Sequence, residues 1–222
     1  MLSEVMEDYL KAIYVLQRED GPPVSTSQIA DYLDVTPPTV SSMVEKLEER
    51  GLLEREKYTG VELTDEGETV ALEVIRHHRL IEAYLAEHLD YDWSEVHEEA
   101  DQLEHHISEA FERRVADALD DPEVDPHGAP IPGEDLSPPA PVDATRLDET
   151  AAGDRVVVER VPEEDEDVLS YLQESGLMPG EFLTVEEVAP FGMITTTPDR
   201  REESVSLPTD VARSIRVSEV EE

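Results

Sequence analysis

Cysteine is absent from this 222-residue sequence, which excludes disulfide bonds, thiolate zinc sites and thiol catalysis. Apolar runs of the length that a membrane span requires are also missing. The first ten residues lack the basic and apolar pattern of a secretion signal. We therefore expect a cytoplasmic protein with no membrane partner.

Positive charge is scarce, because 17 lysines and arginines stand against 56 aspartates and glutamates, for a formal net charge of −39. Disorder is one interpretation of such a composition, but regular helical patterns along most of the chain oppose it. The composition is similar to that of proteins from extreme halophiles. At about 1 M salt the Debye length is about 3 Å, so the self-repulsion would be largely screened. The acidity thus indicates adaptation to solvent and does not exclude nucleic acid as a partner.

The first 64 residues follow the pattern of a winged helix. Residues 4–17 have helical periodicity, and two short capped helices are predicted over 25–35 and 36–47, with a tight turn near Asp34. Their spacing is that of a helix-turn-helix. Residues 52–63 then predict a hairpin, and a helix-turn-helix followed by a hairpin is a winged helix.

The second of these short helices is nearly neutral, although acids make up a quarter of the chain. Short hydroxyl side chains can meet base edges, proline and threonine carbons can contact a thymine methyl group, and basic wing residues can meet phosphates. The alternative is that the hydroxyls only cap the helix and the domain mediates protein contacts. We expect double-stranded DNA contacts from Thr36, Pro37, Pro38, Thr39, Ser41, Ser42 and Lys46, and from Arg55 and Lys57 on the wing.

Imidazoles and carboxylates gather further along the chain. If residues 96–108 are helical, His97, Asp101, Glu104 and His105 share an arc of about 100° beside the apolar face. Helices are predicted over 65–89 and from the break near 90–93 to about residue 119, and their antiparallel packing would bring His78 and Glu82 towards His97. Such a set invites a divalent cation. The alternative is a solvated acidic face with incidental histidines.

The C-terminal half contains a proline-rich segment and a small β domain. Residues 121–150 hold seven of the 16 prolines and show little periodicity, which indicates a linker. Alternating patterns predict strands over 154–161, 182–185 and 193–197, around a short helix over 165–175. Together they predict a small barrel.

These parts, in this order, resemble the metal-dependent repressors of the diphtheria-toxin-repressor family over essentially the whole chain. The stretches that carry the resemblance are Glu7-Asp8-Tyr9-Leu10, residues 33–41, 76–82, 96–97, 104–106, 128–133 and 176–180. The resemblance implies a mainly α fold with a small β domain. It divides the chain into a winged helix-turn-helix domain (1–64), a helical metal-binding and dimerisation domain (65–120), a linker (121–150) and an SH3-like, FeoA-type barrel (151–222).

The resemblance also implies two metal sites. The primary site would use Asp8, Asp101, Glu104 and His105, and the second would use His78, Glu82 and His97 with an acid from the barrel, for which we choose Asp165. Iron-responsive members of the family place Met and Cys where this chain has Asp8 and Asp101, whereas manganese-responsive members place carboxylates there. Oxygen ligands with imidazole suit Mn²⁺ or Fe²⁺. Lys11 replaces a carboxylate that some manganese members use for a two-metal centre, which favours a separate second site.

The function expected from this resemblance is that of a homodimeric repressor that binds an operator in double-stranded DNA, senses Mn²⁺ or Fe²⁺ and controls metal-uptake genes. We expect neither a catalytic activity nor a small-molecule substrate. Three alternatives stay open: an iron-responsive member of the same family, a winged-helix regulator that senses an organic ligand, and a metal-dependent hydrolase. Against the hydrolase, the sequence contains no His-Glu-x-x-His motif.

Overall fold

A computed structural model of the chain describes residues 2–56, 59–140, 144–163, 165–190, 192–201 and 203–220. The described residues form two compact units. Unit 1 comprises Met1–His77, Glu104–His106 and Pro132–Pro138, and unit 2 comprises His78–Leu103, Ile107–Ile131 and Pro139–Glu222.

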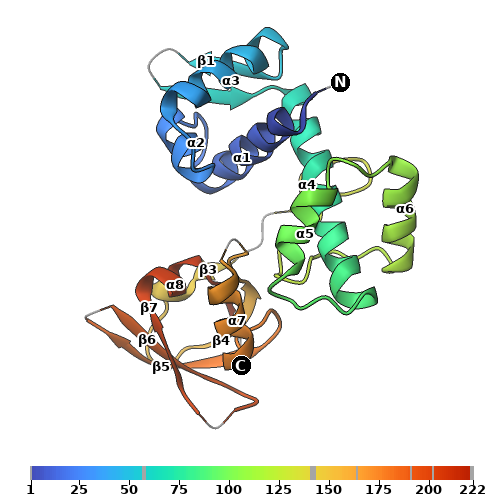
Figure 1. Cartoon of the computed structure of the whole chain (residues 1–222). Helices are drawn as coiled ribbons and strands as arrows, with labels where there is room; N and C mark the ends of the chain where they lie inside the picture. Colours follow the sequence, from blue (N-terminus) through green and yellow to red (C-terminus); the bar gives the residue numbers. More distant parts are fainter. Residues whose placement is uncertain are drawn as a thin grey trace. The chain divides into compact units, whose positions relative to one another are not determined.

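Unit 1 is built around a winged helix, which confirms the prediction for this part of the chain (Figure 1). Ser25 begins the second helix with a reciprocal capping box to Gln28, and prolines occupy the first turn of the third helix, where a missing N–H costs little. The elements are α1 (Glu4–Asp20), α2 (Thr26–Tyr32), α3 (Pro37–Glu49) and the antiparallel hairpin β1 (Leu53–Glu56) and β2 (Gly60–Leu63).

The core of unit 1 joins the helices of the winged helix to its hairpin. Leu10 and Ile13 of α1 are fully buried, as are Ile29 of α2 and Val40 of α3. Their spacing along α1 and α3 places one apolar stripe of each helix against the others, and Leu53 and Val61 of the hairpin join the same core.

Helix α4 (Asp65–His88) is the longest element, and its residues up to His77 belong to unit 1 while the rest belong to unit 2. Near its start, a Cβ atom added at Gly67 would lie 1.9 Å from the carbonyl oxygen of Leu52. Glycine therefore lets α4 begin directly against the hairpin. Across the described part of the chain, no helix combines the length and the apolar character needed to cross a membrane.

The helix predicted to run from about residue 96 to 119 is interrupted, so this part of the prediction was wrong. The structure has α5 (Val96–Leu103) and α6 (Glu109–Ala118). Ser108 is the reason for the second start, because its hydroxyl accepts the backbone N–H of Phe111 and caps α6. Glu104 and His105 therefore lie in the turn after α5, outside its helical arc.

The helices of unit 2 pack on α4 through two small cores. Ile81 and Leu85 meet Val96 and Ala100 of α5. On another side of α4, Leu80 and Ala83 pack with Val115, Ala116 and Leu119 from α6 and its C-terminal end.

The barrel forms one antiparallel sheet in the order β3-β8-β4-β5-β6-β7 among the described residues, which confirms the expected fold class (Figure 1). Alternation predicted the three longest strands, whereas β3, β7 and β8, with two to four residues each, are too short to show it. The elements are β3 (Thr145–Arg146), η1 (Leu147–Glu149), β4 (Arg155–Arg160), α7 (Glu166–Ser175), β5 (Phe182–Ala189), β6 (Met193–Pro198), β7 (Val205–Pro208), α8 (Thr209–Ser214) and β8 (Arg216–Glu219).

Part of the proline-rich segment is fixed against the barrel. The backbone N–H of Val161 donates to the carbonyl oxygen of His127 at 3.0 Å. Gly128 has φ +89°, and a Cβ atom there would lie 1.9 Å from the carbonyl oxygen of Glu159. Asp125 orders the same turn, because its Oδ1 accepts the N–H groups of His127 and Ala129, each at 2.9 Å. The segment thus has a fixed path over residues 125–129.

We expect Gly67→Ala to destabilise the winged helix by about 1–3 kcal/mol, because the added methyl group overlaps the Leu52 carbonyl. In a helix without such a close contact, replacing glycine by alanine would stabilise the helix by up to about 1 kcal/mol. Chemical denaturation followed by circular dichroism measures the difference, with the exposed neighbour Glu66→Ala as the matched control. A Gly67→Ala protein as stable as the control would contradict the close approach.

Candidate metal centre

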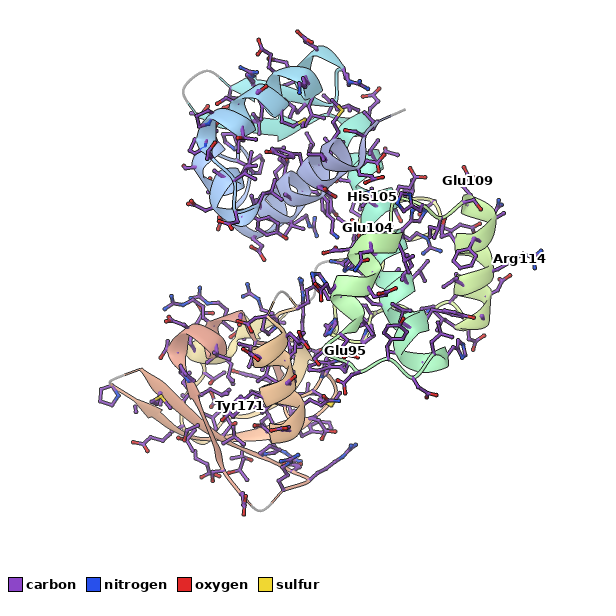
Figure 2. All side chains as sticks on the ribbon, in the orientation of Figure 1. Glu95, Glu104, His105, Glu109, Arg114 and Tyr171 are labelled. Carbon is purple, nitrogen blue, oxygen red and sulfur yellow. The ribbon has the colours of Figure 1, made fainter. Side chains whose placement is uncertain are left out.

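In unit 1, Asp8 of α1 meets Glu104 and His105 from the turn after α5. His105 Nε2 lies 2.9 Å from Asp8 Oδ1 and 3.4 Å from Glu104 Oε1. The Glu104 side chain is only 2 % exposed. One ligand atom from each residue falls within 4.8 Å of the others, the grouping of a cation site. Figure 2 labels Glu104 and His105 at the end of α5.

Glu7 orients the imidazole of His105. Its Oε2 lies 2.8 Å from His105 Nδ1. When Nδ1–H donates to this carboxylate, Nε2 carries the lone pair and faces Asp8. A carboxylate behind a histidine in this way is the usual support of a metal-binding imidazole.

Glu104 is held on three sides. Lys11 Nζ lies 2.8 Å from Oε2, and His77 Nδ1 donates to the Glu104 backbone oxygen at 3.1 Å. Lys11 therefore pairs with one carboxylate oxygen while the other faces His105. Burial raises the pKa of Asp8, and the charge of Glu104 adds to this effect, while the neighbouring His105 acts in the opposite direction.

In unit 2, the fully buried Glu82 meets two imidazoles. Glu82 Oε1 lies 3.0 Å from His78 Nε2 and 3.0 Å from His97 Nδ1, and those two nitrogens are themselves 3.0 Å apart. This is the set of protein ligands expected for the second site, brought together by α4 and α5.

Asp101, which we expected beside Asp8, contacts this second set. Its Oδ1 lies 3.3 Å from His78 Nδ1, and its Oδ2 lies 3.8 Å from His97 Nε2. The end of α5 at Leu103 explains the change. His97 and Asp101 are one helical turn apart and share a face, whereas Glu104 and His105 lie beyond the helix.

A further group around Glu82 was missed by the sequence analysis. Asp125, His127 and Glu163 each bring a ligand atom within 4.8 Å of one from Glu82. His127 Nδ1 lies 3.7 Å from Glu82 Oε1. Asp125 and His127 fall in the stretch that we interpreted as a linker. The available signal was a carboxylate and a histidine two residues apart in an otherwise unpatterned, proline-rich segment.

The choice of Asp165 as the acid from the barrel is corrected by the structure. Asp165 is the N-cap of α7, and its Oδ1 accepts the backbone N–H of Val168 at 3.1 Å. Glu163, two residues earlier, is the barrel residue whose carboxylate lies in the group with Glu82, Asp125 and His127. The capping geometry turns the Asp165 side chain towards its own helix.

The buried acids of unit 2 differ in their ionisation. Burial, together with the charges of Glu82 and Glu163, raises the pKa of Asp125 to about 7. Burial also acts to raise the pKa of Glu82, but the charge of His78 and hydrogen bonds from the surrounding histidines outweigh it and hold this pKa well below its ordinary value. Near neutral pH the metal-free group therefore keeps Glu82 ionised and Asp125 part-protonated.

The residues expected to contact DNA on α3 are all exposed. Some of their hydroxyl groups are engaged within the helix, because Thr36 Oγ1 and Thr39 Oγ1 are 2.8 Å apart and Ser41 Oγ donates to the Pro37 carbonyl at 3.0 Å. On the wing, Arg55 Nε pairs with Glu48 Oε2 at 3.0 Å. Lys57 lies outside the described residues. The predicted DNA contacts that lie exposed at the N-cap and on α3 are Thr36, Pro37, Pro38, Thr39, Ser41, Ser42 and Lys46.

Three family models match successive parts of the chain. Residues 1–61 match "Iron dependent repressor, N-terminal DNA binding domain", and residues 64–133 match "Iron dependent repressor, metal binding and dimerisation domain". Residues 145–219 match the FeoA domain.

Curated relatives are similar over nearly the whole length. The chain is 37 % identical to "Iron-dependent repressor IdeR" of Mycobacterium tuberculosis over 230 residues, covering 99 % of each sequence. It is 32 % identical to "Diphtheria toxin repressor" of Corynebacterium diphtheriae, again covering 99 % of each.

Solved structures are similar to the same extent. "Manganese-dependent transcriptional repressor complex with manganese" has a TM-score of 0.89 and 36 % identity, covering 97 % of this chain and 100 % of that one. "Crystal structure of T. acidophilum IdeR" has a TM-score of 0.79 and 28 % identity, covering 99 % of both chains.

We expect the metal-free protein to lose stability between pH 4 and 7 through Asp125. Its pKa in the folded state is raised from the ordinary value of 3.8 to about 7, so in this range the folded protein holds a proton that the unfolded chain releases. As pH rises towards 7, the stability that this proton contributes is lost. The slope from one such group is at most about 1.4 kcal/mol per pH unit. Asp125→Asn removes this slope but keeps an oxygen for the two backbone N–H groups of the turn.

The measurement is urea unfolding of the chelator-treated protein across this pH range. The control is Asp117→Asn on the exposed face of α6. Equal pH dependence in wild type, control and Asp125→Asn would show that Asp125 titrates normally.

Proposed function

The chain belongs to the family of metal-dependent transcriptional repressors, and from this premise we propose that it represses metal-uptake genes when Mn²⁺ or Fe²⁺ binds. The observation that carries the proposal is the cluster of Asp8, Glu104 and His105. It joins the first helix of the DNA-binding domain to a turn in the metal-binding and dimerisation domain. Its partners would be an operator in double-stranded DNA and a second copy of the chain.

The donor atoms determine the class of cation. The cluster offers carboxylate oxygens and one imidazole, and cysteine is absent from the chain. Hard oxygen donors with imidazole suit Mn²⁺ and Fe²⁺, and the lack of sulfur removes a preference for softer ions. The relative from Mycobacterium tuberculosis is named for iron and one structural neighbour is named for manganese, which agrees with either ion.

The switch follows from charge. Asp8 and Glu104 repel each other, and Lys11 neutralises only part of that charge. A divalent cation reverses the sign of the interaction and holds α1 to the turn at Glu104–His106. A cation with a higher affinity for the arrangement that fits DNA shifts the population towards that arrangement. A tenfold gain in DNA affinity requires only about 1.4 kcal/mol of such coupling.

The DNA-facing surface would be the exposed side of α3. Pro38 and Ser42 take no part in the Thr36–Thr39 and Ser41–Pro37 hydrogen bonds. The Pro38 ring carbons are suited to a thymine methyl group, and the Ser42 hydroxyl is suited to a base edge. Lys46 and the wing residue Arg55 would meet phosphates. We retain Lys57 as a phosphate contact on the grounds of its sequence position alone.

A cation bound by the candidate ligands of unit 2 would hold the helices of that unit together. His78, Glu82 and His97 would hold a cation between α4 and α5 through the ring nitrogens that face Glu82. Asp101 contacts the opposite ring nitrogens and would orient the two imidazoles. Exposed apolar side chains nearby supply a surface for dimerisation, since Leu103 is 36 % and Phe111 is 48 % exposed. Contiguous apolar patches on a surface are typical of sites that a partner covers.

We expect Mn²⁺ to raise operator affinity at least tenfold, and Asp8→Ala or Glu104→Ala to abolish that gain while DNA binding without metal stays unchanged. Fluorescence anisotropy with the protein's own upstream DNA, with and without Mn²⁺ in high KCl, measures the effect. Glu98→Ala, on the exposed side of α5, removes a charge without touching the cluster and serves as the control. Equal affinity under all these conditions would remove the mechanism.

The acidic surface predicts a shallow salt dependence of DNA binding. Proteins that make 6–10 phosphate contacts release about as many counterions and lose affinity steeply with salt. With a net charge of −39, this chain should release fewer. We expect the slope of log K against log [KCl] to be smaller in magnitude than in those proteins, and Arg55→Gln to reduce it by about one. A steep loss of affinity with rising KCl would contradict this expectation.

A further inference from the structure

We propose that Trp93 is a positioning residue that anchors the barrel to the helices of unit 2. With its side chain in place the barrel is docked, and releasing that side chain would release the barrel. The same anchor would hold α5 and the ring of His127 in place. The inference goes beyond the proposed function, because it assigns a role to the barrel and needs no bound cation.

Trp93 belongs to the helical part of the chain by sequence and to the barrel by packing. It lies in the connection between α4 and α5, and only 7 % of its surface is exposed. Among the described residues, it is the one member of the barrel's apolar core that comes from outside residues 147–217. Because a buried tryptophan removes about 150–250 Å² from water, the barrel core gains a large apolar contact from the helical part.

The polar atoms of Trp93 fix how the indole enters the core. Its Nε1–H donates to the carbonyl oxygen of Pro126 at 2.8 Å. Its own carbonyl oxygen lies 3.1 Å from His127 Nε2, and the two rings are 5.0 Å apart at an interplanar angle of 45°. A buried indole N–H without a partner is unfavourable, so these contacts select one position of the ring. Trp93 is therefore a specific anchor and not a general apolar filler.

Docking of Trp93 also orients two imidazoles of unit 2. A carbonyl oxygen only accepts hydrogen bonds, so His127 Nε2 carries a proton and donates it to the Trp93 carbonyl oxygen. The other ring nitrogen, Nδ1, is thereby turned towards Glu82 Oε1, at 3.7 Å. His97 lies four residues after Trp93, in the first turn of α5. Because the anchor fixes the residues before α5, it holds this histidine as well as His127.

The covalent connection alone does not determine where the barrel lies on the helices of unit 2. The chain leaves those helices at Ile131, passes through residues 132–138 of unit 1 and reaches the first strand of the barrel at Thr145. A backbone hydrogen bond joins Val161 to His127, but such a bond contributes little net free energy because it replaces a bond to water. Burial of a tryptophan contributes more, and tryptophan is enriched among the residues that dominate interface energies.

Trp93 is the only tryptophan of the chain, so its fluorescence reports directly on the docked state. The full-length protein, treated with chelator and kept in high KCl, should show the short-wavelength emission of a buried indole and weak quenching by acrylamide. Emission at long wavelength with strong quenching would reveal an indole in water and would overturn the proposal. Since the protein is metal-free in this measurement, neither result depends on the proposed function.

Hydrogen exchange of the same metal-free protein separates docking of the barrel from its folding. In Trp93→Ala, the amides of residues 125–129, of Val161 and of α5 should exchange at least tenfold faster than in the wild type, while β5 and β6 keep their protection. Trp93→Phe keeps an aromatic ring but lacks the N–H for Pro126, and its exchange should lie between the two. Tyr91→Ala removes an exposed aromatic ring two residues earlier, and this matched control should exchange as the wild type does.

Unchanged exchange in Trp93→Ala would overturn the proposal, because the barrel would then be held without the anchor. If Trp93→Ala does not fold, Trp93→Phe decides. Loss of protection in β5 and β6 to the same extent as in residues 125–129 of Trp93→Phe would also overturn the proposal, because Trp93 would then be required for folding of the barrel. A gain in DNA affinity of the wild type with Mn²⁺ would persist in either case, so this failure is distinguishable from failure of the proposed function.

Discussion

The ionised carboxylate of Glu82, buried in the middle of α4, is the constraint on which the arrangement of unit 2 depends. An isolated charge in such a place is strongly unfavourable, so positive or hydrogen-bonding groups must surround it. Side chains from several parts of the chain meet this need: His78 from its own helix, His97 from α5 and His127 from the proline-rich segment. The contacts that stabilise the Glu82 charge therefore hold several parts of the chain around α4. These parts are α5, the segment 125–129 and the adjoining end of β4.

The interruption between α5 and α6 determines which candidate ligands lie together. In a continuous helix, His97, Asp101, Glu104 and His105 would share one stripe and serve one site. Because Ser108 caps a new helix, the chain turns after Leu103 and divides the stripe into two sets. His97 and Asp101 serve unit 2, and Glu104 and His105 serve Asp8. A capping hydroxyl thus divides the candidate ligands between the two units.

The sequence predicted what depends on local pattern and missed what depends on tertiary contact. Helical periodicity, the cap at Ser25 and the prolines of α3 identify the winged helix, and His78 and Glu82 share a face by spacing alone. Asp165 and Glu163 are both acids before α7, and only the capping bond to Val168 decides which one is free to reach Glu82. Asp125 and His127 carry no periodic signal, because their turn is fixed by hydrogen bonds to Asp125 Oδ1 and by the bond from the Val161 N–H, just after β4, to the His127 carbonyl oxygen.

The two groups differ in how their carboxylates are neutralised, and Lys11 accounts for part of the difference. Its ammonium group pairs with Glu104 Oε2, so the cluster in unit 1 already contains one fixed positive charge beside two carboxylate ligands. Since the charges of Asp8, Glu104 and Lys11 sum to −1, this cluster still attracts a cation. Around Glu82 the arginines contact the outer acids, while Glu82 itself contacts only histidines among the ion pairs of the described residues. Glu82 therefore relies on imidazoles, which are positive only when protonated, whereas Glu104 is paired with an ammonium group.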